Sequence, residues 1–287
     1  MAKTGLVLEG GAMRGLFTAG VMDVLMEQGI SFDGLIGVSA GAAFGCNYKS
    51  GQIGRVLRYN KRFAHDWRFC SVRSLLTTGD IYGGEFCYHY MPEHLDLFDQ
   101  QAFNASSMEY VVVCTDIETG EPVYKTLMTY NDEMCEYIRA SASMPVAAKI
   151  VEIDGRKLLD GGISDSIPLK QFQQMGYKKN IVVTTQPLGY QKQHNRLMPL
   201  FRLFLRNYPN MLHVLDTRHI MYNKQLEYVA QAEREGRCLV IRPSEKIPIG
   251  HISHNPDQMR HVYNLGRAAG EQYLDRIKAF YSFLTCN

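Results

Sequence analysis

The first 51 residues alternate between short apolar runs and helical patterns, and this alternation constrains the fold more than any other feature. The runs TGLVLE (4–9) and FDGLIGV (32–38) indicate buried strands. Each is followed by a short loop and a segment with helical apolar spacing, over 16–29 and 40–51. Repeated strand–helix units predict a parallel sheet with helices on both faces. Because crossovers are right-handed, both loops should lie at the carboxyl edge of the sheet, where ligands bind.

The rest of the chain continues this pattern and then becomes mainly helical. Further strands are expected over 108–117, 122–127, 148–153, 156–160, 180–185 and 238–243, and helices over 131–145, 168–176, 190–236 and 255–284. Asn131 is the expected N-cap of the helix over 131–145, and Asp154-Gly155 is a strong hairpin turn. We expect a domain over 1–186 and a helical C-terminal extension over 187–287, whose strand returns to the main sheet.

Composition excludes several classes of protein. The net charge of +2 and the lack of a dense Lys/Arg run argue against a nucleic-acid binder. Seven cysteines without a CxxC pair indicate reduced thiols rather than a disulfide framework. No segment approaches the roughly 20 apolar residues of a membrane span, and the start does not resemble a secretory signal. We therefore expect a soluble cytoplasmic protein.

Basic and aromatic residues alternate in the irregular region 52–107. The basic residues are Arg55, Arg58, Lys61, Arg62, Arg68 and Arg73. A solvated helical face explains them more simply than a binding patch, although the sequence leaves both interpretations open.

One hydroxyl lies between two glycines at the end of the second expected strand. The stretch LIGVSAGAAFG (35–45) contains the spacing Gly37-x-Ser39-x-Gly41, which matches the nucleophile elbow. Small residues at these positions let a cramped strand-to-helix turn form, and the following helix directs free N–H groups at the serine. Close packing of a helix on a sheet is the alternative explanation.

The loop after the first strand is also rich in small residues. The backbone N–H groups of Gly10, Gly11 and Ala12 could bind an oxyanion. Arg14 could fix the loop or bind a phosphate, and Gly15 completes the motif. A dinucleotide fingerprint is the rival interpretation. It is disfavoured because the second strand ends in Val-Ser rather than in the acid that holds a ribose.

The acid Asp160 ends the apolar strand over 156–160 and is followed by Gly161 and Gly162. These glycines leave space for the carboxylate to reach a neighbouring loop, although a bare turn is also possible. No histidine follows a strand in a conspicuous loop, so the histidines are expected to be structural. His251 and His254 lack a third ligand at metal-binding spacing, so no metal site is expected.

Three motifs in this order, LEGGAMRG, GVSAG and LLDGGISDSIPL, resemble the patatin-like phospholipase family over about residues 5–172. The resemblance implies a three-layer α/β/α fold with a mostly parallel central sheet. It also implies lipid acyl hydrolysis, without a metal or cofactor, by a Ser-Asp dyad that has no histidine. On this basis Ser39 is the nucleophile, Asp160 is the general base and Gly10–Ala12 form the oxyanion hole. Ala12 stands where glycine is commoner.

Two other functions stay open at this point. An acyltransferase on the same fold is disfavoured because no histidine lies near Ser39, and a non-catalytic lipid-binding protein is disfavoured because both dyad residues are present. The stretch 196–215, interpreted as one helix, would place Leu197, Leu200, Phe201 and Phe204 on a shared face. That face could belong to the core, or to a cap that makes transient contact with an anionic membrane surface.

Overall fold

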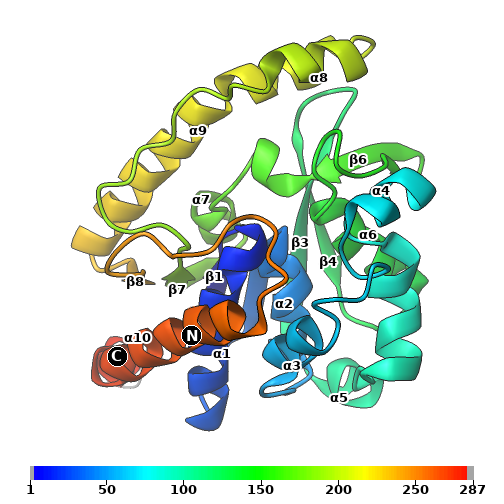
Figure 1. The fold of residues 1–287 in the computed structure, drawn as a ribbon. Helices are drawn as coiled ribbons and strands as arrows, with labels where there is room; N and C mark the ends of the chain where they lie inside the picture. Colours follow the sequence, from blue (N-terminus) through cyan, green and yellow to red (C-terminus); the bar gives the residue numbers. More distant parts are fainter. Residues whose placement is uncertain (1–2, 283–287) are drawn as a thin grey trace.

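The computed structural model describes residues 3–282 and has a central sheet between two layers of helices (Figure 1). The sheet order is β5-β6-β3-β2-β1-β7-β8, and β4 pairs with β3 off this path. The strands are β1 (Lys3–Leu8), β2 (Gly34–Val38), β3 (Glu109–Asp116), β4 (Pro122–Leu127), β5 (Val151–Ile153), β6 (Arg156–Asp160), β7 (Tyr177–Val183) and β8 (Cys238–Ile241). Strands β3, β2, β1, β7 and β8 are parallel, whereas β4, β5 and β6 form antiparallel pairs. The sheet is therefore mostly parallel.

The helices vary in length from one turn to more than seven. The α-helices are α1 (Gly15–Glu27), α2 (Ala40–Lys49), α3 (Arg55–Arg62), α4 (Val72–Thr78), α5 (Gln100–Ala105), α6 (Asp132–Ser141), α7 (Leu169–Gln174), α8 (Met198–Phe204), α9 (Pro209–Arg234) and α10 (Pro256–Ser282). Two 3₁₀ turns, η1 (Ala12–Arg14) and η3 (Gly161–Ile163), and a π-helical segment, η2 (Phe86–Leu95), complete them. Within the described residues, no helix is long and apolar enough to cross a membrane.

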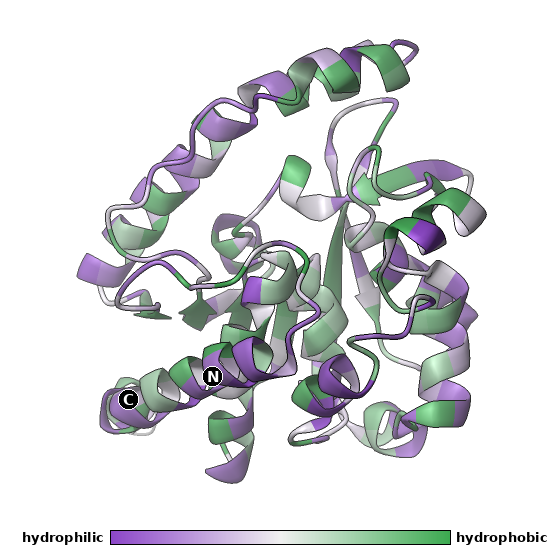
Figure 2. Cartoon of the chain, viewed as in Figure 1, coloured by the Kyte–Doolittle hydropathy of each residue, from purple (hydrophilic) through white to green (hydrophobic). Residues whose placement is uncertain are grey.

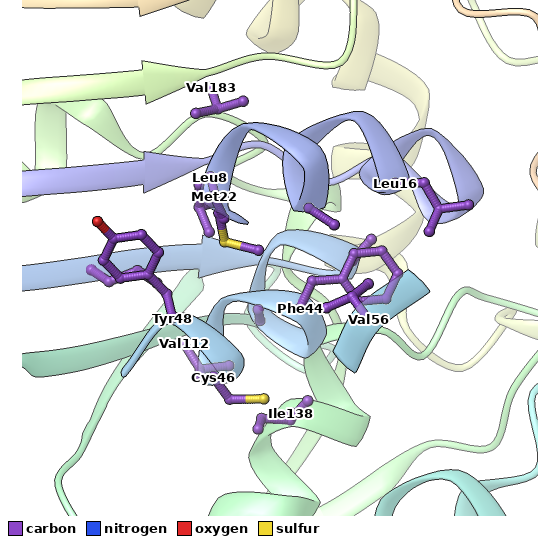
Figure 3. Close-up of a cluster of buried hydrophobic side chains, with 14 of the residues drawn as sticks. Leu8, Leu16, Met22, Phe44, Cys46, Tyr48, Val56, Val112, Ile138 and Val183 are labelled. Atoms are coloured by element: carbon purple, nitrogen blue, oxygen red, sulfur yellow. The ribbon is translucent and has the colours of Figure 1, made fainter. Parts of the chain in front are cut away.

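Alternating side chains of the strands divide the core between the two faces of the sheet. Leu8 and Val112 point to one face, where they join Met22, Phe44 and Ile138 from α1, α2 and α6 (Figure 3). The neighbouring strand residues belong to a second cluster under α7 and α9. Figure 2 shows the resulting contrast between green strands and helices of mixed colour. The predicted three-layer α/β/α class is confirmed.

The local sequence signals correspond to the observed element ends. Asn131 accepts a hydrogen bond from the Met134 N–H and so caps α6. Asp154 and Gly155 both have positive φ, at 53° and 71°, as the turn between β5 and β6 requires. Strand β8 lies parallel to β7 at the sheet edge, and α10 packs on α1. The division of the chain at residue 186 stays a prediction.

Two expectations for the helical regions are wrong. The stretch 196–215 is not one helix, because α8 ends at Phe204 and α9 begins at Pro209, whose ring cannot continue a preceding helix. The basic residues of 52–107 do not all lie on a solvated face, since Arg55 is only 3% exposed. It lies 3.1 Å from the Asp96 carboxylate and donates to the Asn47 side chain, so its charge is paired inside the protein.

Candidate active site

Ser39 occupies the sharp turn between β2 and α2. Its backbone has φ 55° and ψ −120°, a left-handed conformation that costs free energy for any residue other than glycine. The turn is possible because the flanking positions lack side chains. A Cβ atom on Gly41 would lie 2.4 Å from the Leu8 carbonyl oxygen, and one on Gly37 would lie 2.6 Å from the Gly41 carbonyl oxygen. These distances give the physical reason for the glycine spacing in the sequence.

The Ser39 hydroxyl is directed at a carboxylate at the end of β6, which is separated from β2 by β3. Ser39 Oγ donates a hydrogen bond of 2.7 Å to Asp160 Oδ2. Ser39 N–H donates to Ser141 Oγ, which in turn donates to the Val113 carbonyl at 2.6 Å. Helix α6 and strand β3 therefore fix the backbone of the elbow, while Asp160 fixes the hydroxyl.

Asp160 lies at the end of β6, where the chain enters η3. Its Oδ1 accepts the Gly162 N–H at 2.8 Å, and its own N–H donates to the Ser143 carbonyl. Gly161 is needed for close approach, because a Cβ there would lie 2.1 Å from the Val113 carbonyl oxygen. Burial raises the pKa of the Asp160 carboxyl, and the nearby Arg218 charge and the Ser39 hydrogen bond lower it. The carboxylate is thus buried, but it accepts two hydrogen bonds and lies near the positive charge of Arg218.

The loop after β1 lies beside the serine. A Cβ atom added to Gly10 would come within 3.0 Å of Ser39 Cβ, so the loop and the elbow are in close approach. Within the described residues, the N–H groups of Gly10, Gly11 and Ala12 donate no hydrogen bond. Ala12 has φ 48°, a region that glycine enters at lower cost. These N–H groups are therefore available to a ligand, and their role as an oxyanion hole stays a prediction.

The remaining residues of the loop motif have structural partners. Arg14 Nη1 lies 3.4 Å from His251 Nε2 at the rim of the site. Gly15 lets α1 approach α2, because a Cβ there would lie 2.8 Å from the Phe44 ring and 2.9 Å from Ala40 Cβ. Arg14 thus contacts the loop before α10.

Ser39 opens on an apolar cavity of about 270 Å³. Its wall combines the irregular region 52–107 with α2 and α6, and includes Phe44, Tyr59, Phe69, Tyr88, Met134 and Ile138. Five aromatic residues of the region 52–107 line this cavity, namely Tyr59, Phe69, Tyr82, Tyr88 and Phe98. A pocket of this composition suits a hydrocarbon chain rather than a charged ligand.

Four polar residues near Ser39 and Asp160 were not predicted from the sequence: Glu9, Tyr222, Arg218 and Lys192. Glu9, just before the Gly10–Ala12 loop, accepts hydrogen bonds from the Thr185 N–H at 2.6 Å and from the hydroxyl of Tyr222. Burial raises the pKa of Glu9. Arg218 donates to the carbonyl of Gly162.

Lys192 is the fourth of these residues and belongs to the loop between β7 and α8. Both its backbone N–H and its carbonyl bond to the Asn223 side chain. Its side chain lies over the Tyr222 ring, with Nζ 4.7 Å from the ring centroid. Burial and the neighbouring Arg218 charge lower its pKa to about 8. The spacing of Arg218 and Tyr222, four residues apart on one helix, is the only sequence signal that links any of the four.

Several histidines have hydrogen-bond partners within the protein. His254 Nδ1 lies 2.7 Å from the Ala64 carbonyl, and His194 Nε2 lies 2.8 Å from Asp216. His194 lies in the loop before α8, not in a helix as its sequence context suggested. In the described part of the chain, no group of three or more His, Cys, Asp or Glu residues could hold a metal ion.

Comparison with known proteins identifies the family. The family model described as patatin-like phospholipase matches residues 6–172, which is more than half of the chain. The chain belongs to the patatin-like phospholipase family. This membership places it among the lipid ester hydrolases. A second model, described only as a domain of unknown function (DUF6363), matches residues 208–282.

Individual relatives are distant but cover almost the whole chain. An uncharacterized protein of Escherichia coli strain K12, YjjU, is 27% identical over 95% of this chain and 77% of its own length. Lysophospholipase nte1 of Aspergillus oryzae is 25% identical over 96% of this chain. The chain spans only 18% of the length of that lysophospholipase. The crystal structure of VipD from Legionella pneumophila aligns with a TM-score of 0.54 at 13% identity, over 96% of this chain and 67% of VipD, which shows a shared fold.

Proposed function

We propose that this protein hydrolyses the fatty acyl ester of a phospholipid or lysophospholipid through a Ser39–Asp160 dyad. The observation that carries the proposal is the 2.7 Å hydrogen bond from Ser39 Oγ to Asp160 Oδ2. A serine held on an elbow and bonded directly to a carboxylate is the arrangement of a nucleophile and its base. The fungal relatives that are named lysophospholipases support the substrate class.

The reaction has two halves that share the same groups. Ser39 Oγ attacks the ester carbonyl carbon while Asp160 takes the hydroxyl proton, and the free N–H groups of Gly10–Ala12 stabilise the oxyanion. Collapse of the intermediate breaks the bond to the alcohol, which leaves with the proton from Asp160. Water then attacks the acyl-enzyme, Asp160 takes a proton from the water, and Ser39 is regenerated as the fatty acid leaves.

The environment of Asp160 suits a base without an intervening histidine. Burial raises the pKa of its carboxyl, which makes the carboxylate a stronger proton acceptor than an exposed one. The Arg218 charge and the donated hydrogen bonds oppose this shift and so favour the carboxylate form that accepts a proton. The apolar cavity beside Ser39 accommodates the acyl chain.

We also propose that helix α8 makes a transient contact with anionic lipid surfaces. Phe201 faces the core at 5% exposure, but Leu203 and Phe204 are 66% and 61% exposed. Arg202 and Arg206 lie on the same short segment and are exposed, which gives charge complementarity with an anionic bilayer. The buried side of α8 packs near Val146, in the segment that continues into the cavity wall at Ala147 and Ala148.

Release of fatty acid from defined lipids tests the activity. The wild-type protein and a Ser39→Ala variant would be assayed on lysophosphatidylcholine, a diacyl phospholipid and a neutral monoacylglycerol. We expect the wild type to release fatty acid from lysophospholipid and the variant to lose this activity by several orders of magnitude. Equal rates for both proteins would reject the dyad. Transfer to added alcohol acceptors in preference to water would indicate an acyltransferase.

A further inference from the structure

Helix α9 reaches the catalytic centre from the part of the chain that matches a domain of unknown function. This match covers residues 208–282, and α9 spans Pro209–Arg234. Arg218 Nε donates a hydrogen bond of 2.6 Å to the Gly162 carbonyl oxygen. The N–H of that same Gly162 donates to Asp160 Oδ1. The guanidinium therefore holds the residue whose N–H orients the catalytic carboxylate.

The Arg218 side chain and the Asp160 carboxylate converge on Gly162. A Cβ atom at Gly162 would lie 3.1 Å from Asp160 Oδ1 and 3.2 Å from Arg218 Nη2. A side chain at position 162 would therefore crowd both groups. Among the described residues, Arg218 has no carboxylate oxygen within 4 Å, and Asp160 and Glu9 are the carboxylates whose charges act on it from farther away.

Other charged and titratable groups also face Asp160. Lys192 approaches from the loop before α8 and contributes a weaker positive influence than Arg218. Tyr88 of η2 and Cys114 of β3 lie on the other sides, and burial raises the pKa of both, so they are neutral near neutral pH. Arg218 is therefore the main charge that opposes the effect of burial on the Asp160 carboxylate.

We propose that Arg218 is a positioning residue that fixes the Asp160–Gly162 turn and supplies the charge that keeps the Asp160 carboxylate ready to accept the serine proton. The inference rests on the proposed Ser39–Asp160 function. It assigns a role to residues 208–282, which match only a domain of unknown function. One helical turn further on, the Tyr222 hydroxyl donates to Glu9, which precedes the Gly10–Ala12 loop. A single face of α9 thus contacts the segments that carry both the base and the oxyanion donors.

The pH dependence of kcat/KM on a short, soluble ester tests this role. An Arg218→Gln variant removes the charge and shortens the reach of the side chain. We expect kcat/KM near neutral pH to fall by about tenfold or more, and the acidic limb of the profile to move to higher pH, because loss of a neighbouring positive charge favours the protonated carboxyl. Activity should then recover partly as the pH is raised.

Two further variants separate this role from a general effect on folding. Arg218→Lys keeps a positive charge, so its acidic limb should move less than that of Arg218→Gln. Lys224→Gln removes a positive charge from an exposed position of the same helix and should leave the profile unchanged. Each rate would be divided by the folded fraction measured by circular dichroism at the same pH, so that the limb position reports on Asp160 even in a less stable variant.

The outcomes are distinct from those that test the proposed function. An Arg218→Gln limb that coincides with the wild-type limb would overturn the positioning role, even if Ser39→Ala were inactive. An equal shift in Arg218→Lys and Arg218→Gln would also overturn it, because charge would not be the cause. Retained activity in Ser39→Ala would instead reject the dyad itself.

Discussion

Ser39 Oγ and Asp160 Oδ2 lie 2.7 Å apart although 121 residues separate them in the chain. The parallel pairing of β2 with β3 and the antiparallel pairing of β3 with β6 bring the ends of β2 and β6 together. The elbow then directs the hydroxyl toward the carboxylate without an imidazole between them. The following predictions concern the consequences of this contact and of the packing that makes it possible.

Asp160→Asn should nearly abolish activity, whereas Asp154→Asn should cost little activity. Asp160→Asn keeps the shape of the side chain but removes the proton acceptor, and should lower kcat by about a thousandfold or more. Asp154→Asn retains a residue that suits the turn and can still accept the Tyr137 hydroxyl, but it weakens the exposed ion pair with Lys125 Nζ at 3.0 Å, so we expect activity close to that of the wild type. Initial rates on a soluble ester, corrected for folded protein by circular dichroism, measure both. If Asp154→Asn were the inactive variant, the base would be misassigned.

Ala12→Gly should stabilise the protein. Ala12 has φ 48°, and glycine adopts this conformation at lower cost, so we expect a gain of about 1 kcal/mol in the free energy of unfolding. The matched control is Ala19→Gly, inside helix α1, which should lose about 1 kcal/mol or more. Urea denaturation of both variants gives the comparison. A loss of stability in Ala12→Gly would mean that the backbone at this position is not strained.

Gly41→Ala should be strongly destabilising. Its new Cβ would lie 2.4 Å from the Leu8 carbonyl oxygen, so either β1 or α2 must move, at a cost of about 3 kcal/mol or more. Gly250→Ala is the control, because its nearest atom, the Ile252 oxygen, would be 3.3 Å away. Thermal melting should show a large decrease only for Gly41→Ala. Similar melting temperatures for the two variants would show that α2 can shift away from the strand.

Buried and exposed apolar residues of α8 should respond differently to polar substitution. Phe201→Glu places a charge in the core and should lower the melting temperature substantially. A Leu203→Ser and Phe204→Ser double variant should keep the melting temperature and the hydrolysis of short esters, and bind less to anionic vesicles. Vesicle sedimentation and differential scanning fluorimetry provide the two measurements. Unchanged vesicle binding by the double variant would reject the proposed lipid contact of α8.

Local patterns in the sequence predicted those parts of the fold that short segments determine. The strand–helix alternation before residue 52, the Asn131 cap and the Asp154-Gly155 turn all depend on residues within a few positions of one another. The elbow glycines also follow from local steric limits. The pairing of Ser39 with Asp160 spans a much longer distance along the chain, and it was expected only from the family resemblance.

The parts that were missed depend on contacts between distant segments. Arg55 looked solvent-exposed because its ion-pair partner, Asp96, lies 41 residues away. Arg218 and Gly162 are 56 residues apart in the sequence, and no local pattern near either residue predicts their hydrogen bond. The break before Pro209 was visible in the sequence but was outweighed by the apolar spacing on both sides of it. Tertiary contacts decided the first two cases, and the proline ring decided the third.

The most direct measurement of the central claim is the site at which a fluorophosphonate ester labels the folded protein. The wild-type protein and the Ser39→Ala and Asp160→Asn variants would be treated with the probe, and peptide mass spectrometry would locate the adduct. We predict one adduct per chain, on Ser39, absent from Ser39→Ala and formed much more slowly in Asp160→Asn, because only the base activates this hydroxyl. An adduct on another residue, or equal labelling rates in Asp160→Asn and the wild type, would contradict the account.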